Sequence, residues 1–118
     1  MGHDTAALFS NSDDLAADLD AAGRGTGEKL WRLPLNQGLR SKLDSPVADL
    51  KNYAGRLGGA ITAALFLNEF VAEGTDWAHL DIAGPAWDEA AGLPTGFGAA
   101  ALAEWLLARR WAGGGGGE

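Results

Sequence analysis

The stretch from Gly55 to Gly84 constrains the fold more than any other part of the sequence. It begins with a glycine-rich turn, continues as an apolar segment from about Gly58 to Ala72 that predicts a helix, and ends, after Gly74, in the apolar run Trp77 to Ala83. Loop, helix, turn and strand follow one another in that order. If Ala48 to Tyr53 is also extended, the stretch predicts a βαβ unit, with two parallel strands and the helix packed on one face.

The predicted central helix is apolar over most of its surface. Thr62, Glu69 and Glu73 fall on one narrow strip of the helix, and apolar side chains cover most of the remainder. A helix of this kind is expected to be buried on several sides. In the strand that follows, successive side chains alternate, so Leu80 and Ile82 share one face and His79 and Asp81 share the other.

Two further helices are predicted, one near each end of the chain. The first begins at about Asp13, is capped by Asn11 or Ser12, and ends in a glycine-rich segment. Its apolar stripe is Leu15, Leu19 and Ala22. The last helix runs from Gly98 to about Trp111, and its predicted inner face consists of Ala101, Leu102, Trp105 and Leu106.

The remaining segments are expected to be irregular or short. The run from Leu30 to Leu35 predicts an extended connector, because Pro34 is unsuited to a central strand. Asn36 to Leu43 is expected to form a helical turn or two, and Asp88 to Pro94 a loop. Three helices against one or two short strands indicate an α/β fold, as a partial three-layer domain. A parallel pair of that size is rarely stable alone, so the chain resembles part of a larger domain.

The composition excludes several kinds of site and partner. With no cysteine, the chain has no disulfide, thiolate metal ligand or cysteine nucleophile. Its formal net charge of -7 repels phosphate backbones and anionic membrane surfaces, so we expect neither a nucleic-acid nor a membrane partner. No apolar run approaches the roughly 20 residues of a membrane helix, and the start, MGHDTAALFSN, lacks the features of a signal peptide. These observations predict a cytoplasmic protein.

Two short constellations could carry chemistry, and each has a structural alternative. The turn from Gly55 to Gly59 precedes a helix N-terminus that could bind an anion, although glycines that permit a tight turn are the favoured interpretation. His79 and Asp81 could form a general-base pair or contribute two metal ligands, although a structural role is favoured for both. No GxSxG elbow is present, so the residues alone compose no complete active site.

Several longer strings together resemble one enzyme family. They are LFSN (8–11), GEKLWRLPL (27–35), ADLKN (48–52), GGAITAALFL (58–67), WAHLDIAG (77–84) and TGFG (95–98). In this order and spacing they resemble the C-terminal part of the leucyl aminopeptidase, or cytosol aminopeptidase, family. The resemblance implies that residues 1–112 are a C-terminal segment of an aminopeptidase catalytic domain, incomplete relative to the family's α/β domain. Residues 113–118 are expected to be a disordered glycine-rich tail.

The resemblance also implies an activity and its cofactors. Enzymes of this family are hydrolases that remove N-terminal residues, including leucine, from peptides, and they are typically homohexamers. Two divalent ions, commonly zinc, manganese or magnesium, activate water in the complete enzyme, assisted by a lysine and an arginine. The family's ligand motif, NTDAEGR, does not occur in this chain. The resemblance therefore implies that these residues include no metal ligand and no catalytic lysine or arginine.

The family's substrate pocket maps onto two residues of this chain. Residues just after LDI help to line the pocket for the substrate's N-terminal side chain, which implies that Ala83 and Ala86 bind substrate. Their small side chains would leave room for leucine. The main hypothesis is a fragment of a leucyl aminopeptidase that is inactive alone. A non-catalytic module that docks on related subunits is the alternative, and an anion-binding module that uses the Gly55 turn ranks last.

Overall fold

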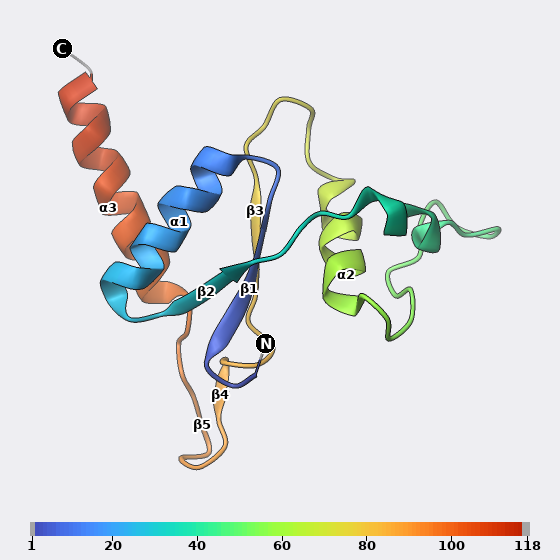
Figure 1. Cartoon of the computed structure of the whole chain (residues 1–118), viewed down its shortest axis with the longest axis horizontal. Helices are drawn as coiled ribbons and strands as arrows, with labels where there is room; N and C mark the ends of the chain where they lie inside the picture. The colour runs from blue at the N-terminus through green and yellow to red at the C-terminus, as the bar shows by residue number, and fades with distance from the viewer. Residues whose placement is uncertain (1, 117–118) are drawn as a thin grey trace.

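The computed structural model describes the backbone of residues 2–116 and the side chains of residues 2–109. It is a mixed α/β structure, which confirms the predicted fold class (Figure 1). In chain order its elements are β1 (Thr5–Ser10), α1 (Asp13–Thr26), β2 (Lys29–Arg32), the 3-10 helix η1 (Gln37–Leu43), α2 (Gly59–Asn68), β3 (Ala78–Asp81), β4 (Trp87–Asp88), β5 (Leu93–Pro94) and α3 (Ala99–Gly116).

The N-terminal strand β1 is the centre of the structure. The main sheet has the order β2-β1-β3, in which β1 pairs parallel with β2 and antiparallel with β3. Ala6, Ala7, Leu8 and Phe9 in β1 are at most 1% exposed, because the strand is covered on both faces and along both edges. The predicted βαβ unit is therefore wrong. No strand forms over Ala48–Tyr53, and β3 takes its hydrogen bonds from β1 instead.

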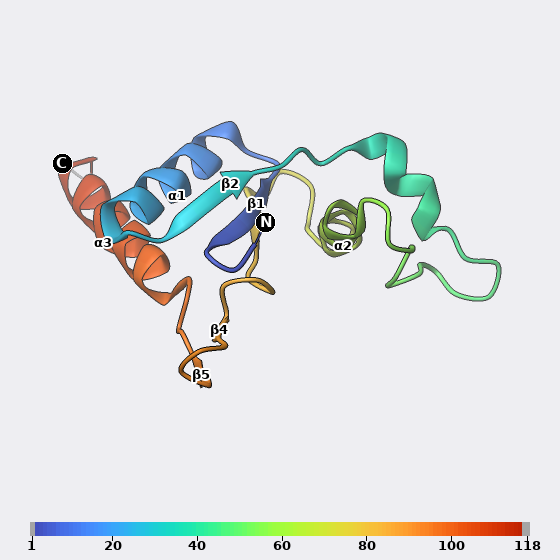
Figure 2. The ribbon, with the colours of Figure 1, turned by 60° about the horizontal axis from the view of Figure 1, so that its bottom comes forward.

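Side chains from β1 alternate between two separate layers of the core. Ala6 and Leu8 pack with α1 and with Leu30 of β2, while Phe97, just before α3, and Trp105, within α3, cover the same cluster. Ala7 and Phe9 point to the opposite face. There they pack against α2 and the residues beside it, which are Leu33, Leu35, Ala60, Ile61, Ala64 and Trp77. Helices α1 and α3 thus cover one face of the sheet and α2 the other (Figures 1 and 2).

Helix α1 forms much as its sequence predicts. Ser12 is the N-cap, with its hydroxyl oxygen accepting a hydrogen bond from the Leu15 amide at 3.1 Å. The helix ends at Gly27, whose φ of 78° is the left-handed conformation that glycine adopts without strain. Gly23 lies inside the helix rather than ending it. A Cβ there would lie 2.7 Å from the Glu28 carbonyl oxygen, so glycine allows β2 to start close to the helix.

Helix α2 is shorter and less buried than predicted. It ends at Asn68, and the predicted polar residue Thr62 is buried, while Leu67 and Phe70 are exposed. The reason is that described elements cover α2 on only two sides, the sheet on one and η1 on another. An ion pair between Arg40 of η1 and Glu69 links the two helices.

The short elements differ from prediction in detail. The predicted connector overlaps strand β2, which lies at the edge of the sheet and stops before Pro34. Segment 37–43 is helical, as predicted. The predicted loop from Asp88 to Pro94 forms most of the small hairpin β4–β5, which begins at Trp87.

The last helix begins near its predicted start and runs further. Helix α3 continues to Gly116, beyond the expected end at Trp111. Ala101 and Trp105 face the core, but Leu102 and Leu106 are exposed, so the predicted inner face is only half right. The predicted tail overlaps the end of α3, and residues 117 and 118 lie outside the described residues. The division into residues 1–112 and 113–118 stays a prediction.

The whole structure is open and flat. Its principal extents are 51 × 44 × 19 Å, and its radius of gyration of 16.1 Å exceeds the about 13.5 Å expected for a compact chain of this length. Many large apolar side chains are exposed, among them Val47 at 93%, Leu57 at 80% and Phe70 at 71%. Trp31 and Trp87 are also exposed, so the chain does not bury all its tryptophans. These features are those of part of a larger domain.

Candidate functional site

The two predicted substrate-binding residues lie on one tight turn at the end of β3. The Ala86 amide donates to the Ile82 carbonyl at 3.0 Å, and the Ala83 amide donates to Asp81 Oδ1 at 3.1 Å. Ala83 is exposed and Ala86 is half-buried, on either side of the buried Pro85. The strand therefore fixes where the turn begins, and Asp81 stabilises its first residue.

Thr95 holds the other end of this turn. Its amide donates to the Ala86 carbonyl at 2.9 Å, and its hydroxyl donates to the Pro85 carbonyl at 2.6 Å. The Phe97 amide in turn donates to the hydroxyl oxygen of Thr95 at 3.1 Å. The TGFG segment thus connects the turn after β3 to the start of α3. The strings WAHLDIAG (77–84) and TGFG (95–98) therefore belong to one structural unit.

The N-terminal residues pack directly on the same turn. A Cβ placed on Gly84 would overlap the carbonyl oxygen of Gly2, so glycine at position 84 lets the two backbones touch. A hollow of about 350 Å³ adjoins the turn. Its lining residues are His3, Trp87, Asp88, Glu89, Ala90 and Thr95. Four of the lining residues, Trp87 to Ala90, come directly after Ala86 in the chain, but neither Ala83 nor Ala86 lines the hollow.

His79 and Asp81 lie on the same face of β3, as predicted, but each contacts other groups. The His79 ring stacks on Phe9 at 5.9 Å and on Trp77 at 6.4 Å, measured between ring centroids. Burial lowers the pKa of His79 below its usual 6.5, and the charge of Asp81 opposes that shift. Because Asp81 accepts from the turn and His79 packs between aromatic rings, the structural interpretation is favoured for both.

The glycines before α2 are explained by backbone geometry. Gly55 and Gly58 have φ angles of 98° and 65°, which side chains rarely adopt. A Cβ on Gly58 would also lie 2.9 Å from Leu39 Cδ1. A tight turn packed against η1 therefore explains the glycines at positions 55 and 58 without a bound anion.

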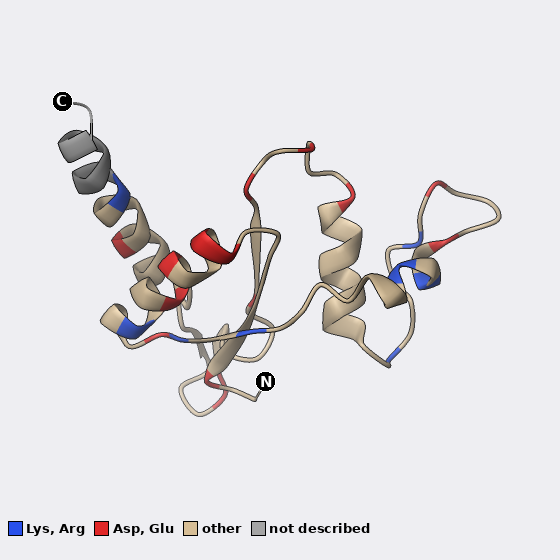
Figure 3. Cartoon of the chain, turned by 45° about the horizontal axis from the view of Figure 1, so that its top comes forward, with Lys and Arg blue, Asp and Glu red and all other residues tan. Residues whose placement is uncertain are grey.

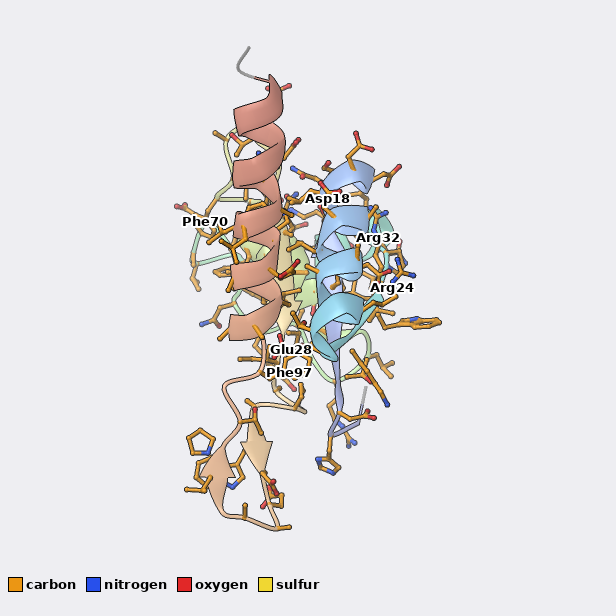
Figure 4. All side chains as sticks on the ribbon, turned by 90° about the vertical axis from the view of Figure 1, so that its left-hand side faces the viewer. Asp18, Arg24, Glu28, Arg32, Phe70 and Phe97 are labelled. Carbon is orange, nitrogen blue, oxygen red and sulfur yellow. The ribbon has the colours of Figure 1, made fainter. Side chains whose placement is uncertain are left out.

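Glu28 is a structural residue that sequence reasoning missed. Its Oε2 accepts from the Gly98 amide at 2.9 Å, and its Oε1 accepts from the Ala101 amide at 2.8 Å. The carboxylate lies below the first turn of α3, near Phe97 (Figure 4). Glu28 therefore caps α3, and its negative charge interacts favourably with the positive end of the helix dipole. No local signal could reveal this, since 70 residues separate Glu28 from Gly98.

The described residues lack two structural features. Among residues 2–116, no group of three or more histidine, aspartate or glutamate side chains is arranged to hold a metal ion. The described helices include none long and apolar enough to cross a membrane. The residues present therefore do not fit the dinuclear metal centre that the family resemblance implies for a complete enzyme.

Comparison with known sequences identifies the family. The chain matches the description "Cytosol aminopeptidase family, catalytic domain" over residues 1–103. The chain belongs to the cytosol aminopeptidase family. The match confirms the resemblance to leucyl aminopeptidases, which are hydrolases.

Individual relatives are much longer than this family member. It is 53% identical to a probable cytosol aminopeptidase of Synechococcus sp. (strain CC9605), covering 92% of this chain and 23% of the relative. It is 50% identical to the neutral leucine aminopeptidase, chloroplastic, of Solanum lycopersicum, covering 91% of this chain and 19% of the relative. The chain thus spans about a fifth of the length of these curated relatives.

Solved structures of similar proteins share the fold of this cytosol aminopeptidase family member. The K354E mutant of tomato leucine aminopeptidase superposes with a TM-score of 0.87 at 44% identity, over 91% of this chain and 21% of that chain. The bottromycin maturation enzyme BotP gives a TM-score of 0.85 at 46% identity, over 92% of this chain and 25% of that chain. The open arrangement of sheet and helices is therefore the arrangement of one part of a larger family domain.

Proposed function

We propose that this chain supplies the scaffold and part of the substrate pocket of a metal-dependent leucyl aminopeptidase. The observation that carries the proposal is the family match over residues 1–103, combined with coverage of only about a fifth of the relatives. The complete enzyme would remove apolar N-terminal residues, leucine among them, from peptides. We propose that it acts in the cytoplasm as a homohexamer.

In this proposal Ala83 and Ala86 form one wall of the pocket for the substrate's N-terminal side chain. Support comes from the turn that carries them, because hydrogen bonds from Thr95 and to Asp81 hold its backbone in place. Two methyl side chains on a fixed backbone leave space for a branched apolar group. A fixed wall also costs little conformational entropy when the substrate binds.

The chemistry of hydrolysis would come from outside these residues. Two divalent ions, zinc, manganese or magnesium, would activate water and polarise the scissile carbonyl in the complete enzyme. Among the described residues, no three histidine, aspartate or glutamate side chains come together as a group that could hold a metal ion. We therefore propose that the isolated chain is inactive. We expect no metal-stimulated release from a leucyl chromogenic amide by the purified chain, and clear turnover would refute this part of the proposal.

Complementation tests the pocket. The chain would be co-expressed with the part of the tomato enzyme that it does not match, and leucyl and alanyl amides would be compared. We expect Ala86→Trp to lower kcat/KM for the leucyl substrate more than for the alanyl one, because the larger ring fills the space of the longer side chain. Ala72→Trp, at an exposed position away from the turn, is the matched control. Equal effects of Ala86→Trp on both substrates would refute the proposed role.

A second candidate function is a non-catalytic module that docks on aminopeptidase subunits. The observations in its favour are the unpaired outer edge of β3 within the described sheet and the poorly covered α2. Such an edge accepts another strand readily. Size-exclusion chromatography with full-length subunits separates the candidates. A docking module co-elutes with complete subunits, whereas a fragment combines only with a chain that lacks this segment.

A further inference from the structure

Hydrogen bonds hold the peptide groups on both sides of Ala86. The oxygen of the preceding peptide group, the Pro85 carbonyl, accepts from the Thr95 hydroxyl at 2.6 Å. The N–H of that group, on Ala86, donates to the Ile82 carbonyl at 3.0 Å. The oxygen of the following peptide group, the Ala86 carbonyl, accepts from the Thr95 amide at 2.9 Å. Because peptide groups are planar, these three bonds fix the direction of the Cα–Cβ bond of Ala86.

The Thr95 hydroxyl has one orientation in this arrangement. Its oxygen accepts from the Phe97 amide at 3.1 Å, and its single proton points to the Pro85 carbonyl. Pro85 is buried and has no N–H, so its carbonyl is the one backbone group through which a hydrogen bond can hold it. A side chain of the same shape without a hydroxyl cannot make this bond.

The start of α3 holds Thr95 itself. Gly96 and Gly98 have φ angles of 69° and 97°, which let the chain turn sharply between Thr95 and the helix. The Glu28 carboxylate accepts from the Gly98 amide at the end of this short link (Figure 4). Thr95 is therefore tied to a capped helix on one side and to the turn after β3 on the other.

We propose that Thr95 is a positioning residue that determines how well the complete enzyme selects leucine over smaller N-terminal residues. The inference rests on the proposed function, in which Ala86 forms part of the pocket wall. A branched substrate side chain contacts that wall, so its binding depends on where the Ala86 methyl group lies. The methyl side chain of an alanyl substrate is shorter and depends on the wall less. Thr95 acts through the backbone of the turn and not by touching the substrate.

A comparison of leucyl and alanyl amides isolates the effect of position from that of charge. The charged residues between β3 and α3, over positions 82–98, are all acidic (Figure 3). Both substrates carry the same charge, so attraction by these carboxylates contributes equally to both. Replacing Thr95 by valine also leaves the charge unaltered. The ratio of the two kcat/KM values therefore reports the contact with the substrate side chain.

Kinetics of the complemented assembly test the role of Thr95. We expect Thr95→Val to raise KM for the leucyl amide with little change in kcat, and to lower the preference for leucyl over alanyl amide about 10-fold, roughly the discrimination that one methylene group provides. Thr95→Ser keeps the hydroxyl and is expected to keep the preference. Thr26→Val is the matched control, because it removes a half-buried hydroxyl that donates to the Ala22 carbonyl in α1, and it is expected to leave the preference unchanged.

Hydrogen exchange in the full chain gives a second measurement, which needs no activity. Thr95→Val is expected to speed exchange of the Ala86 amide about 5-fold, roughly the effect of losing one hydrogen bond. Exchange of the amides in β1 is expected to stay unchanged, which establishes that the variant is folded. Unchanged exchange at Ala86 would overturn the proposal.

The kinetic outcomes separate this inference from the proposed function. An equal loss for both substrates, a fall in kcat alone, or a loss in Thr95→Ser as large as in Thr95→Val would each overturn the role of Thr95. If Ala86→Trp discriminates between the substrates and Thr95→Val does not, only the role of Thr95 is refuted. If Ala86→Trp affects both substrates equally, the proposed pocket fails and this inference fails with it.

Discussion

Replacing Glu28 by alanine tests how a distant carboxylate stabilises α3. The substitution removes both acceptors of the Gly98 and Ala101 amides, at 2.9 and 2.8 Å, and leaves two N–H groups at the start of the helix unpaired. Hydrogen bonds to a charged group contribute about 1.5–3 kcal/mol each, and loss of an N-cap costs about 0.5–2 kcal/mol. Because one half-buried carboxylate makes both bonds and such contributions are not additive, we expect the free energy of unfolding to fall by about 2 kcal/mol.

Urea unfolding followed by tryptophan fluorescence and circular dichroism measures this loss. A fall of about 2 kcal/mol corresponds to a midpoint about 1 M lower. Glu28→Gln retains one acceptor oxygen, so we expect roughly half the loss. Glu73→Ala removes an exposed carboxylate from a turn and is expected to change little. A loss below about 0.5 kcal/mol for Glu28→Ala, or one equal to that of Glu73→Ala, would refute the assignment of Glu28 as the cap of α3.

Three further predictions concern β3 and its ends. Burial lowers the pKa of His79 below 6.5, so the unfolded chain binds the proton more tightly than the folded one. The free energy of unfolding is therefore expected to fall as pH decreases below about 6.5. The urea midpoint of His79→Gln should lack this part of the pH dependence. Gly84→Ala is expected to lower the free energy of unfolding by about 1–3 kcal/mol, because the added Cβ overlaps with Gly2. Gly25→Ala, whose Cβ would have no atom within 4 Å, should be neutral or stabilising. Equal changes in melting temperature for the two variants would contradict the backbone contact. Asn11→Ala is expected to cost about 1–2 kcal/mol, because its amide donates to the Thr75 carbonyl and accepts from the Trp77 amide, both at 2.8 Å; slower hydrogen exchange at β3 in the variant would be the wrong sign.

Patterns that depend on neighbouring residues were readable from the sequence. A cap at Asn11 or Ser12 and an apolar stripe at helical spacing predicted α1, because capping and helical periodicity act over a few positions. The strand at Ala78–Asp81 and the faces of His79 and Leu80 followed from alternation in the same way. The family strings also identified the cytosol aminopeptidase family directly. The strand β1 was missed, although the uninterrupted apolar run from Ala6 to Phe9 is typical of a strand buried on both faces.

The pairing of distant segments was decided only by the tertiary structure. Strand β3 pairs with β1, which lies about 70 residues earlier in the chain. A local sequence pattern cannot predict this partner, because it depends only on neighbouring residues. The cap of α3 by Glu28 and the contact of Gly84 with Gly2 are non-local for the same reason.

The stretch from Gly55 to Gly84 shows both contributions. Its sequence determined a helix and a strand, because those depend on side-chain periodicity within the segment. How much of that helix is buried depends on what packs around it, and the sheet and η1 leave Leu67 and Phe70 exposed. The turn that carries Ala83 and Ala86 is likewise placed by β1, Thr95 and the N-terminus together. Composition and periodicity describe what a segment can form, but burial and position are properties of the contacts between segments.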